Sequence, residues 1–224
     1  MIRKNTFLAS AVVLLLTACG GGGGSSSTTS VSTATILTVN KDGIYQTSPY
    51  ATSTNYVQNA SSGYFVSSYI REEWAGVGMG YTNGYINPTS GTLNSYSVTN
   101  QTNSEFLWSV SGANYNIALT PPSLDASVLP LNALSAATET KIYGGSNNDK
   151  SLFFFNTSEV DLGLGNDTLI LSQTFATYQF SKVAGSATAV YVTRDGHQTL
   201  VKNVESFQFS NMTKTLSEIL STLP

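Results

Sequence analysis

The sequence is poor in the side chains that most often build catalytic and metal centres. Among 224 residues it has one cysteine, Cys19, and one histidine, His197. A chain with a single cysteine forms no internal disulfide. His197 lies beside a predicted hairpin turn, where we expect it to be solvated. Histidine-based triads and histidine-rich zinc sites are therefore not expected.

Charge is also scarce, because only 10% of the residues are Asp, Glu, Lys or Arg and the formal net charge is -3. Arg3 and Lys4 lie in a segment that we expect to be removed, which would take the charge from -3 to -5. A chain of this kind has no basic surface for a phosphate backbone. Nucleic acid is therefore excluded as an expected partner.

The first eighteen residues have the pattern of an export signal. Arg3 and Lys4 precede the apolar run from Phe7 to Leu16, and small residues follow it. That run is too short to span a bilayer as a helix, and the pattern is typical of a cleaved secretory signal. We expect residues 1–18 to be removed.

The segment Leu16-Thr17-Ala18-Cys19 resembles the lipobox of bacterial lipoproteins. The resemblance implies that Cys19 is acylated and becomes the first residue of the mature chain. Several acyl chains make an effectively permanent anchor, and a lipidated Cys19 leaves no thiol for a cysteine–histidine dyad. Gly20 follows the cysteine where enterobacterial lipoproteins retained in the inner membrane have Asp. The resemblance thus implies an outer-membrane lipoprotein, on the periplasmic or the surface-exposed side.

Residues 19–35 follow as a Gly/Ser/Thr segment with almost no large apolar side chain. It cannot bury enough surface to offset its ordering entropy, so we expect a flexible linker. Beyond it, short runs rich in β-branched and aromatic residues alternate with turn residues, which predicts a mainly β protein. The expected strands are 36–39, 64–70, 74–81, 92–98 and 105–110.

These strands suggest an antiparallel, sandwich-like region over residues 36–140, of unknown role. Pro121 and Pro122 interrupt it, and residues 124–137 predict a short helix or a connection. We therefore expect a domain boundary near residue 140, followed by a second module over residues 141–224.

Two glycine-bearing segments begin this module. Residues 163–170 read GLGNDTLI, and residues 144–149 read GGSNND. They resemble the nonapeptide G-G-x-G-x-D-x-U-x of repeats-in-toxin, or haemolysin-type calcium-binding, proteins. The copies are degenerate, because Leu162 and Asn147 replace glycines and Ser151 takes the apolar position.

Asp149 and Asp167 are eighteen residues apart, which in that family is one turn of a parallel β-roll. The resemblance implies a short β-roll in which one calcium ion lies between the two stacked loops. Glycines permit tight turns at positive φ that expose backbone carbonyls, and each Asp supplies an anionic oxygen. The expected site residues are Asp149, Asp167, Gly145, Asn147, Gly163 and Gly165.

We expect at most one ion, because the segment around Ser158, nine residues after Asp149, lacks the glycine pattern. A single incomplete site predicts weak binding, at about 10⁻⁴–10⁻³ M. The alternative is that both segments are calcium-free turns between strands. In either case we expect residues 152–155 to form a core strand.

The last part of the chain resembles the segment that commonly follows such repeats. Tyr178 and Phe180 alternate, as do Val190 and Val192, and Asp195-Gly196 predicts a type I′ turn that pairs Arg194 with His197. Residues 203–209, NVESFQF, then close the sheet before a terminal helix.

Two further classes of function remain open. Glu72 and Glu73 are neighbours in a predicted strand, so they face opposite sides and make a poor acid/base pair for a hydrolase; we expect a solvated strand edge. Aromatic residues are dense in the first half, but aromatics at strand spacing mostly pack in cores. They are Tyr45, Tyr50, Tyr56, Tyr64, Tyr69, Trp74, Tyr81 and Tyr85.

The sequence therefore predicts a non-enzymatic cell-envelope lipoprotein with a calcium-binding module, held to a membrane through Cys19. The alternatives are a surface protein that adheres to matrix or carbohydrate without calcium, and an exported hydrolase. Other envelope or matrix components are the expected partners. Repeats-in-toxin proteins usually leave the cell without an amino-terminal signal of this type, so the resemblance does not carry over a toxin or protease activity.

Overall fold

The computed structural model describes residues 34–41, 56–66, 70–82, 88–100, 102–119 and 128–224. Cys19, the export signal and most of the linker lie outside the described residues. So do Tyr45, Tyr50, Tyr69 and Tyr85. The described part is mainly β, as the composition predicts, and a short carboxy-terminal helix ends it. None of its helices has the length and apolar character needed to cross a membrane.

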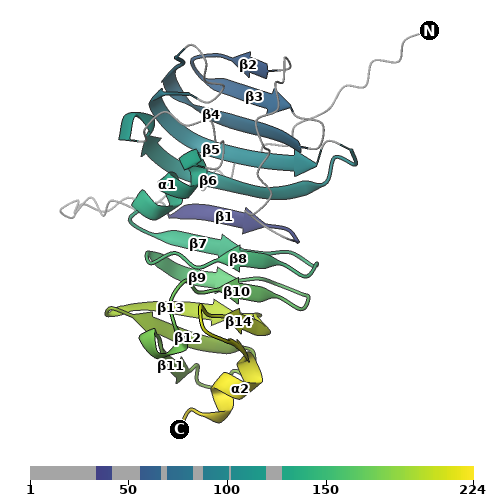
Figure 1. Cartoon of the computed structure of the whole chain (residues 1–224), viewed down its shortest axis with the longest axis vertical. Coiled ribbons are helices and arrows are strands. Elements are labelled where there is room, and N and C mark those ends of the chain that lie inside the picture. The colour runs from purple at the N-terminus through teal and green to yellow at the C-terminus, as the bar shows by residue number, and fades with distance from the viewer. Residues whose placement is uncertain (1–33, 42–55, 67–69, 83–87, 101, 120–127) are drawn as a thin grey trace, which may run out of the picture. The chain divides into compact units, whose positions relative to one another are not determined.

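The described strands form two sheets (Figure 1). The larger has eleven strands in the order β11-β12-β13-β9-β7-β1-β6-β5-β4-β3-β2, and the smaller has four in the order β15-β14-β10-β8. In the first half of the chain the strands are β1 (Thr35–Val39), β2 (Tyr56–Gln58), β3 (Ser62–Val66), β4 (Ile70–Gly80), β5 (Ser90–Asn100) and β6 (Phe106–Asn116). A 3₁₀ turn (Ile117–Leu119) and α1 (Val128–Ala136) follow them.

Strands β2 to β6 form an antiparallel meander, and β6 also pairs with β1. One face of this meander is buried, with Trp74, Tyr96 and Trp108 stacked across β4, β5 and β6. The expected sandwich is not formed by the described residues, because all six strands belong to one sheet. Alternating hydrophobicity predicts that a sheet has one buried face, but it does not predict which element covers that face.

The second half of the chain is a coil whose strands alternate between the two sheets. Its first two turns are β7 (Thr140–Tyr143) with β8 (Lys150–Leu152) and β9 (Thr157–Asp161) with β10 (Thr168–Ile170). A 3₁₀ turn (Phe175–Thr177) and the strands β11 (Gln179–Lys182) and β12 (Ala189–Arg194) are then inserted. A third turn, β13 (His197–Lys202) with β14 (Ser206–Gln208), precedes β15 (Thr213–Thr215) and α2 (Leu216–Ser221).

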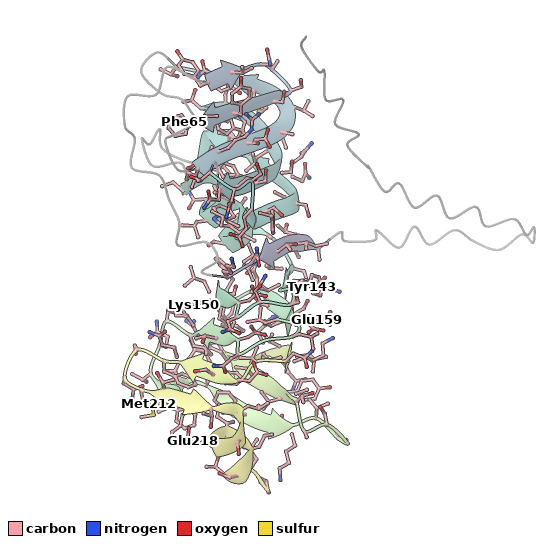
Figure 2. The ribbon with its side chains drawn as sticks, turned by 90° about the vertical axis from the view of Figure 1, so that its right-hand side faces the viewer. Phe65, Tyr143, Lys150, Glu159, Met212 and Glu218 are labelled. Carbon is pink, nitrogen blue, oxygen red and sulfur yellow. The ribbon has the colours of Figure 1, made fainter. Side chains whose placement is uncertain are left out.

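Equivalent strands of successive turns pair in parallel. In the large sheet β9 lies between β7 and β13, and in the small sheet β10 lies between β8 and β14. Their inward side chains form columns: Ile142, Val160 and Val201 share one register, and each is at most 1% exposed. Figure 2 shows Tyr143 and Glu159 on the opposite side of the coil from Lys150. The arrangement is the β-roll-like coil that the repeat spacing predicts.

In the large sheet, β1 joins the two parts of the chain between which the sequence suggests a domain boundary. It pairs antiparallel with β6 and parallel with β7, so the large sheet runs without a break past residue 140. Leu37 is in register with Ile142, and both are fully buried. Thr35, which the composition assigns to the linker, is the first residue of this strand and is 3% exposed.

Most of the other local predictions are confirmed. The Asp195-Gly196 turn has positive φ at both residues, and Arg194 pairs with His197. Val190 and Val192 are buried. The expected core strand over residues 152–155 is wrong in part: β8 ends at Leu152, and Phe155 is 52% exposed after a buried Phe154.

Candidate functional site

The two glycine-bearing loops stack one above the other. Loop 144–149 follows β7 and loop 162–167 follows β9, and Lys150 is in register with Thr168 where the chain re-enters the small sheet. The backbone N–H of Asp149 donates to Asp167 Oδ1 at 2.7 Å. Leu164 N donates to Gly145 O at 2.9 Å. The eighteen-residue spacing therefore brings Asp149 and Asp167 to equivalent positions on adjacent turns.

A third residue, Lys41, occupies the same position one level earlier. Its backbone N–H donates to Asp149 Oδ1 at 2.6 Å, and its carbonyl accepts a hydrogen bond from Lys150 N at 2.7 Å. Asn147 Nδ2 also donates to Asn40 Oδ1 at 2.7 Å. The turn after β1 thus acts as the first level of the coil. Sequence reasoning missed it, because Lys41 belongs to no repeat and lies 108 residues before Asp149.

Glu205 occupies the same position one level later. Asp167 N donates to Glu205 Oε2 at 2.8 Å, and Asp167 O accepts a hydrogen bond from Ser206 N at 2.9 Å. The sequence separation is 38 residues because the β11–β12 insertion interrupts the coil. In the sequence, Glu205 belongs to the Asn-Val-Glu segment, which predicts closure of the sheet and not a further level of the loop stack. We call Asp149, Asp167 and Glu205 the carboxylate column.

The glycines of the second loop are required by its backbone. Gly163 and Gly165 have φ of 86° and 151°. A Cβ on Gly163 would lie 2.1 Å from Gly145 O, and one on Gly165 would lie 2.2 Å from Asn147 O. In the first loop the expectation of positive φ is wrong, because neither Gly145 nor Asn147 adopts it. Gly144 still needs to be glycine, since its Cβ would lie 2.3 Å from Leu162 O.

Both aspartates of the column are buried, at 1% and 0% exposure for Asp149 and Asp167. Burial raises the pKa of Asp149, while the N–H groups of Gly145 and Lys41 act in the opposite direction. Burial raises the pKa of Asp167 to about 6; the charges of Asp149 and Glu205 also raise it, and the N–H of Asp149 lowers it. Burial therefore disfavours the charged form of both carboxyl groups.

One oxygen of the two buried carboxyl groups accepts no hydrogen bond among the described residues. Asp167 Oδ2 is buried and has no hydrogen-bond partner among the described residues. In the first loop the corresponding oxygen, Asp149 Oδ2, accepts from Gly145 N at 2.6 Å. In the second loop Gly163 N donates instead to Asp161 Oδ1, at 3.3 Å. The left-handed backbone at Gly163 thus accompanies the loss of this donor.

A buried carboxylate oxygen without a donor fits a hard cation, and Gly145, Asn147, Gly163 and Gly165 supply backbone carbonyls in the same two loops. The residues present therefore suit calcium in donor type. Nowhere in the described ranges do three or more His, Cys, Asp or Glu side chains converge as a metal cluster. A site here would depend on at most two carboxylates, completed by carbonyls and water.

The opposite side of the coil carries no second glycine loop in the described structure. Ser158 lies inside β9, and its Oγ donates to Glu139 Oε1 at 2.6 Å. The preceding turn is held by Asn156, whose Nδ2 donates to Leu134 O at 2.9 Å. These contacts are those of a structural turn.

The candidate catalytic residues are placed apart. His197 is the first residue of β13 and is half-buried, with Nε2 2.8 Å from Thr157 O, so the expectation of a solvated turn residue is wrong. Glu72 and Glu73 face opposite sides of β4, as predicted. Glu72 is, however, 2% exposed and accepts a hydrogen bond from Tyr96 Oη, because it lies on the packed face of the sheet; it is not at a solvated edge.

The described aromatics of the first half mostly pack as the strand spacing predicts. Trp74 is 2% exposed, and its Nε1 donates to Tyr81 Oη at 3.0 Å. Tyr56 is 47% exposed on β2, and Arg71 lies over the Tyr64 ring at 4.0 Å from its centroid.

No protein-family model matches the sequence, and the search of curated proteins finds no matching relative.

Proposed function

We propose that this chain is a non-enzymatic, lipid-anchored protein of the bacterial cell envelope whose coil binds calcium weakly and is stiffened by it. The observation that carries the proposal is the buried Asp167 carboxylate, stacked on the Asp149 loop with an oxygen that has no donor in the described structure. Asp149 and Asp167 are the candidate side-chain ligands, with the carbonyls of Gly145, Asn147, Gly163 and Gly165 beside them.

The spacing of a parallel coil supports this choice of ion. Neighbouring strands lie about 4.7–4.9 Å apart. Calcium binds oxygen at about 2.3–2.6 Å, so two ligands on opposite sides of one ion are separated by about the same distance. An ion between successive levels would therefore need little distortion of the backbone. It would also offset the repulsion among the carboxylates of the column.

The lipid anchor rests on the signal and the lipobox-like segment that ends at Cys19. Acylation at that residue would hold the protein to a membrane, and the expected location is the outer membrane. Calcium is far more abundant outside the cytoplasm, so a weak site would fill only after export. Other envelope or matrix components are the proposed partners.

A calcium titration of the full chain in detergent tests the metal proposal. At about 10 mM calcium, a site with Kd of about 10⁻⁴–10⁻³ M raises the free energy of unfolding by about 1.4–2.7 kcal/mol. We expect a higher Tm and terbium luminescence that calcium displaces, and both should be lost in Asp167→Asn. An unchanged Tm in the wild type at about 10 mM calcium would refute calcium binding.

The anchor is tested separately, by growing bacteria that express the chain with a labelled fatty acid. We expect label and membrane association in the wild type and neither in Cys19→Ser. A labelled Cys19→Ser protein, or an unlabelled wild type, would contradict lipidation at this residue.

A further inference from the structure

The members of the carboxylate column differ in how many of their oxygens accept a backbone hydrogen bond. Asp149 accepts a backbone N–H at each oxygen, from Lys41 at 2.6 Å and from Gly145 at 2.6 Å. Asp167 accepts one, from Asp149, and its Oδ2 accepts none in the described structure. The free anionic oxygen therefore belongs to the second level of the column and not to the first.

Glu205, one level later in the column, contributes the second carboxylate. Its Oε2 accepts the backbone N–H of Asp167 at 2.8 Å, which fixes the Glu205 carboxyl group at the backbone of that residue. Unlike the two aspartates, Glu205 is exposed, and it borders an open pocket shared with Asn166, Ser206 and Thr215. An ion at this level could keep water ligands, which a site with few protein oxygens needs.

No ammonium or guanidinium group neutralises the column within the described residues. The salt bridges there include none to Asp149, Asp167 or Glu205. The Lys41 side chain turns to Glu105, and Lys202 binds Glu159 and Asp161. Asp167, which is fully buried, and Glu205, which is held at the Asp167 backbone N–H, are thus left without a salt bridge among the described residues.

We propose that the cation is shared by Asp167 and Glu205, one level beyond the pair that the repeat spacing indicates. Asp149 is then a positioning residue, since its N–H holds Asp167 Oδ1 while its own carboxylate caps Lys41 and Gly145. This inference rests on the proposed calcium binding and specifies which carboxylates carry it. It makes Glu205, contributed by the turn between β13 and β14, a ligand outside the glycine loops.

The test is calcium and terbium binding by the full chain in detergent, comparing the wild type with Asp167→Asn, Glu205→Gln and Asp195→Asn. Glutamine at 205 keeps an oxygen that can accept Asp167 N but removes the charge, so a purely structural role would leave calcium affinity unchanged. Asp195→Asn is the matched control, because it removes one charge from an exposed hairpin turn of the same coil. We expect Glu205→Gln to weaken binding by about tenfold or more, Asp167→Asn to abolish it, and the control to match the wild type.

Each result separates the two claims. Calcium binding that is equal in the wild type and Glu205→Gln would overturn the role of Glu205 and leave calcium binding itself standing. A wild type that binds neither calcium nor terbium would overturn both. Loss of affinity in Asp195→Asn equal to that in Glu205→Gln would show a general effect of charge, and would also overturn the assignment.

Discussion

At the scale of single residues, the carboxylate column uses one chemical device at each level. A carboxyl oxygen accepts the backbone N–H of the residue above it: Lys41 N on Asp149, Asp149 N on Asp167, and Asp167 N on Glu205. A buried N–H without an acceptor would cost about 1–3 kcal/mol, so the acids stabilise the turns whether or not an ion is bound. Calcium binding would add to a structural role that these side chains already have.

The second glycine loop offers a stability prediction at residue scale. Gly163 and Gly196 both have positive φ, of 86° and 80°. Only Gly163 lies against neighbouring backbone, because a Cβ added to it would lie 2.1 Å from Gly145 O. We expect Gly163→Ala to lower the free energy of unfolding by about 3–5 kcal/mol. Urea unfolding of the full chain in detergent measures it.

Gly196→Ala is the control for backbone strain alone, because nothing lies within 4 Å of its Cβ position. It should cost about 1–2 kcal/mol. Equal losses in the two variants would mean that close stacking of loops 144–149 and 162–167 contributes nothing.

The pair Asp149 and Asp167 could be predicted from sequence because its spacing is that of an uninterrupted turn. Lys41 and Glu205 could not be assigned in this way. Lys41 reaches the coil through a strand pairing between distant segments, and Glu205 is separated from Asp167 by an inserted hairpin. The sequence also could not predict that Asp167 Oδ2 lacks a hydrogen-bond donor, because this depends on Gly163 N donating to Asp161 Oδ1.

At the scale of elements, the outer face of β7, β9 and β13 is held by ion pairs across neighbouring strands. Lys202 Nζ lies 2.6 Å from Glu159 Oε1 and 3.2 Å from Asp161 Oδ2. The hydrogen bond from Lys202 is the main cause that holds the pKa of Glu159 below its usual value. The same bond raises the pKa of Lys202.

These shifts predict how the stability of the coil depends on pH. A carboxyl group with a lowered pKa in the folded state stabilises the protein above its unfolded pKa, and that stabilisation is lost as pH falls through the folded value. Lys202→Met removes the partner and should lower the free energy of unfolding at pH 7 by about 0.5–1 kcal/mol. The difference from wild type should shrink as the pH falls below the usual Glu range.

Urea unfolding at several pH values measures this difference. Lys182→Met is the matched control, because Lys182 is exposed on β11 and takes part in no salt bridge among the described residues. A gap between wild type and Lys202→Met that stays constant from neutral to acid pH would contradict the ion-pair explanation.

At the scale of the whole described chain, β1 belongs to both halves. Leu37 lies between Val110 of β6 and Ile142 of β7, and the turn after the strand caps the coil through Lys41. The sequence indicated that residues 36–39 form a strand. It did not indicate their neighbours, because which strands pair is decided by tertiary packing and not by local alternation.

This arrangement predicts that a fragment beginning at residue 141 will not fold as the intact coil does. It lacks β1, so β7 becomes an unprotected edge and Ile142 loses its neighbour Leu37. We expect residues 141–224 to unfold without a sharp transition, while residues 34–224 unfold cooperatively. Circular dichroism during heating compares them, and a fragment 141–224 with the same Tm as 34–224 would count against the shared strand.

The position of β1 also constrains the order in which the protein can fold. This strand is synthesised early, yet the Asp149 carboxylate that accepts the Lys41 N–H follows 108 residues later. Contacts between such distant segments form slowly, because a long loop must close before they contribute. If the chain emerges from an export channel amino-terminus first, β1 is exposed before β7 and Asp149 have emerged. An unpaired strand edge promotes aggregation at that stage. For a chain exported as proposed, a chaperone that shields extended segments would matter most before residue 149 has emerged.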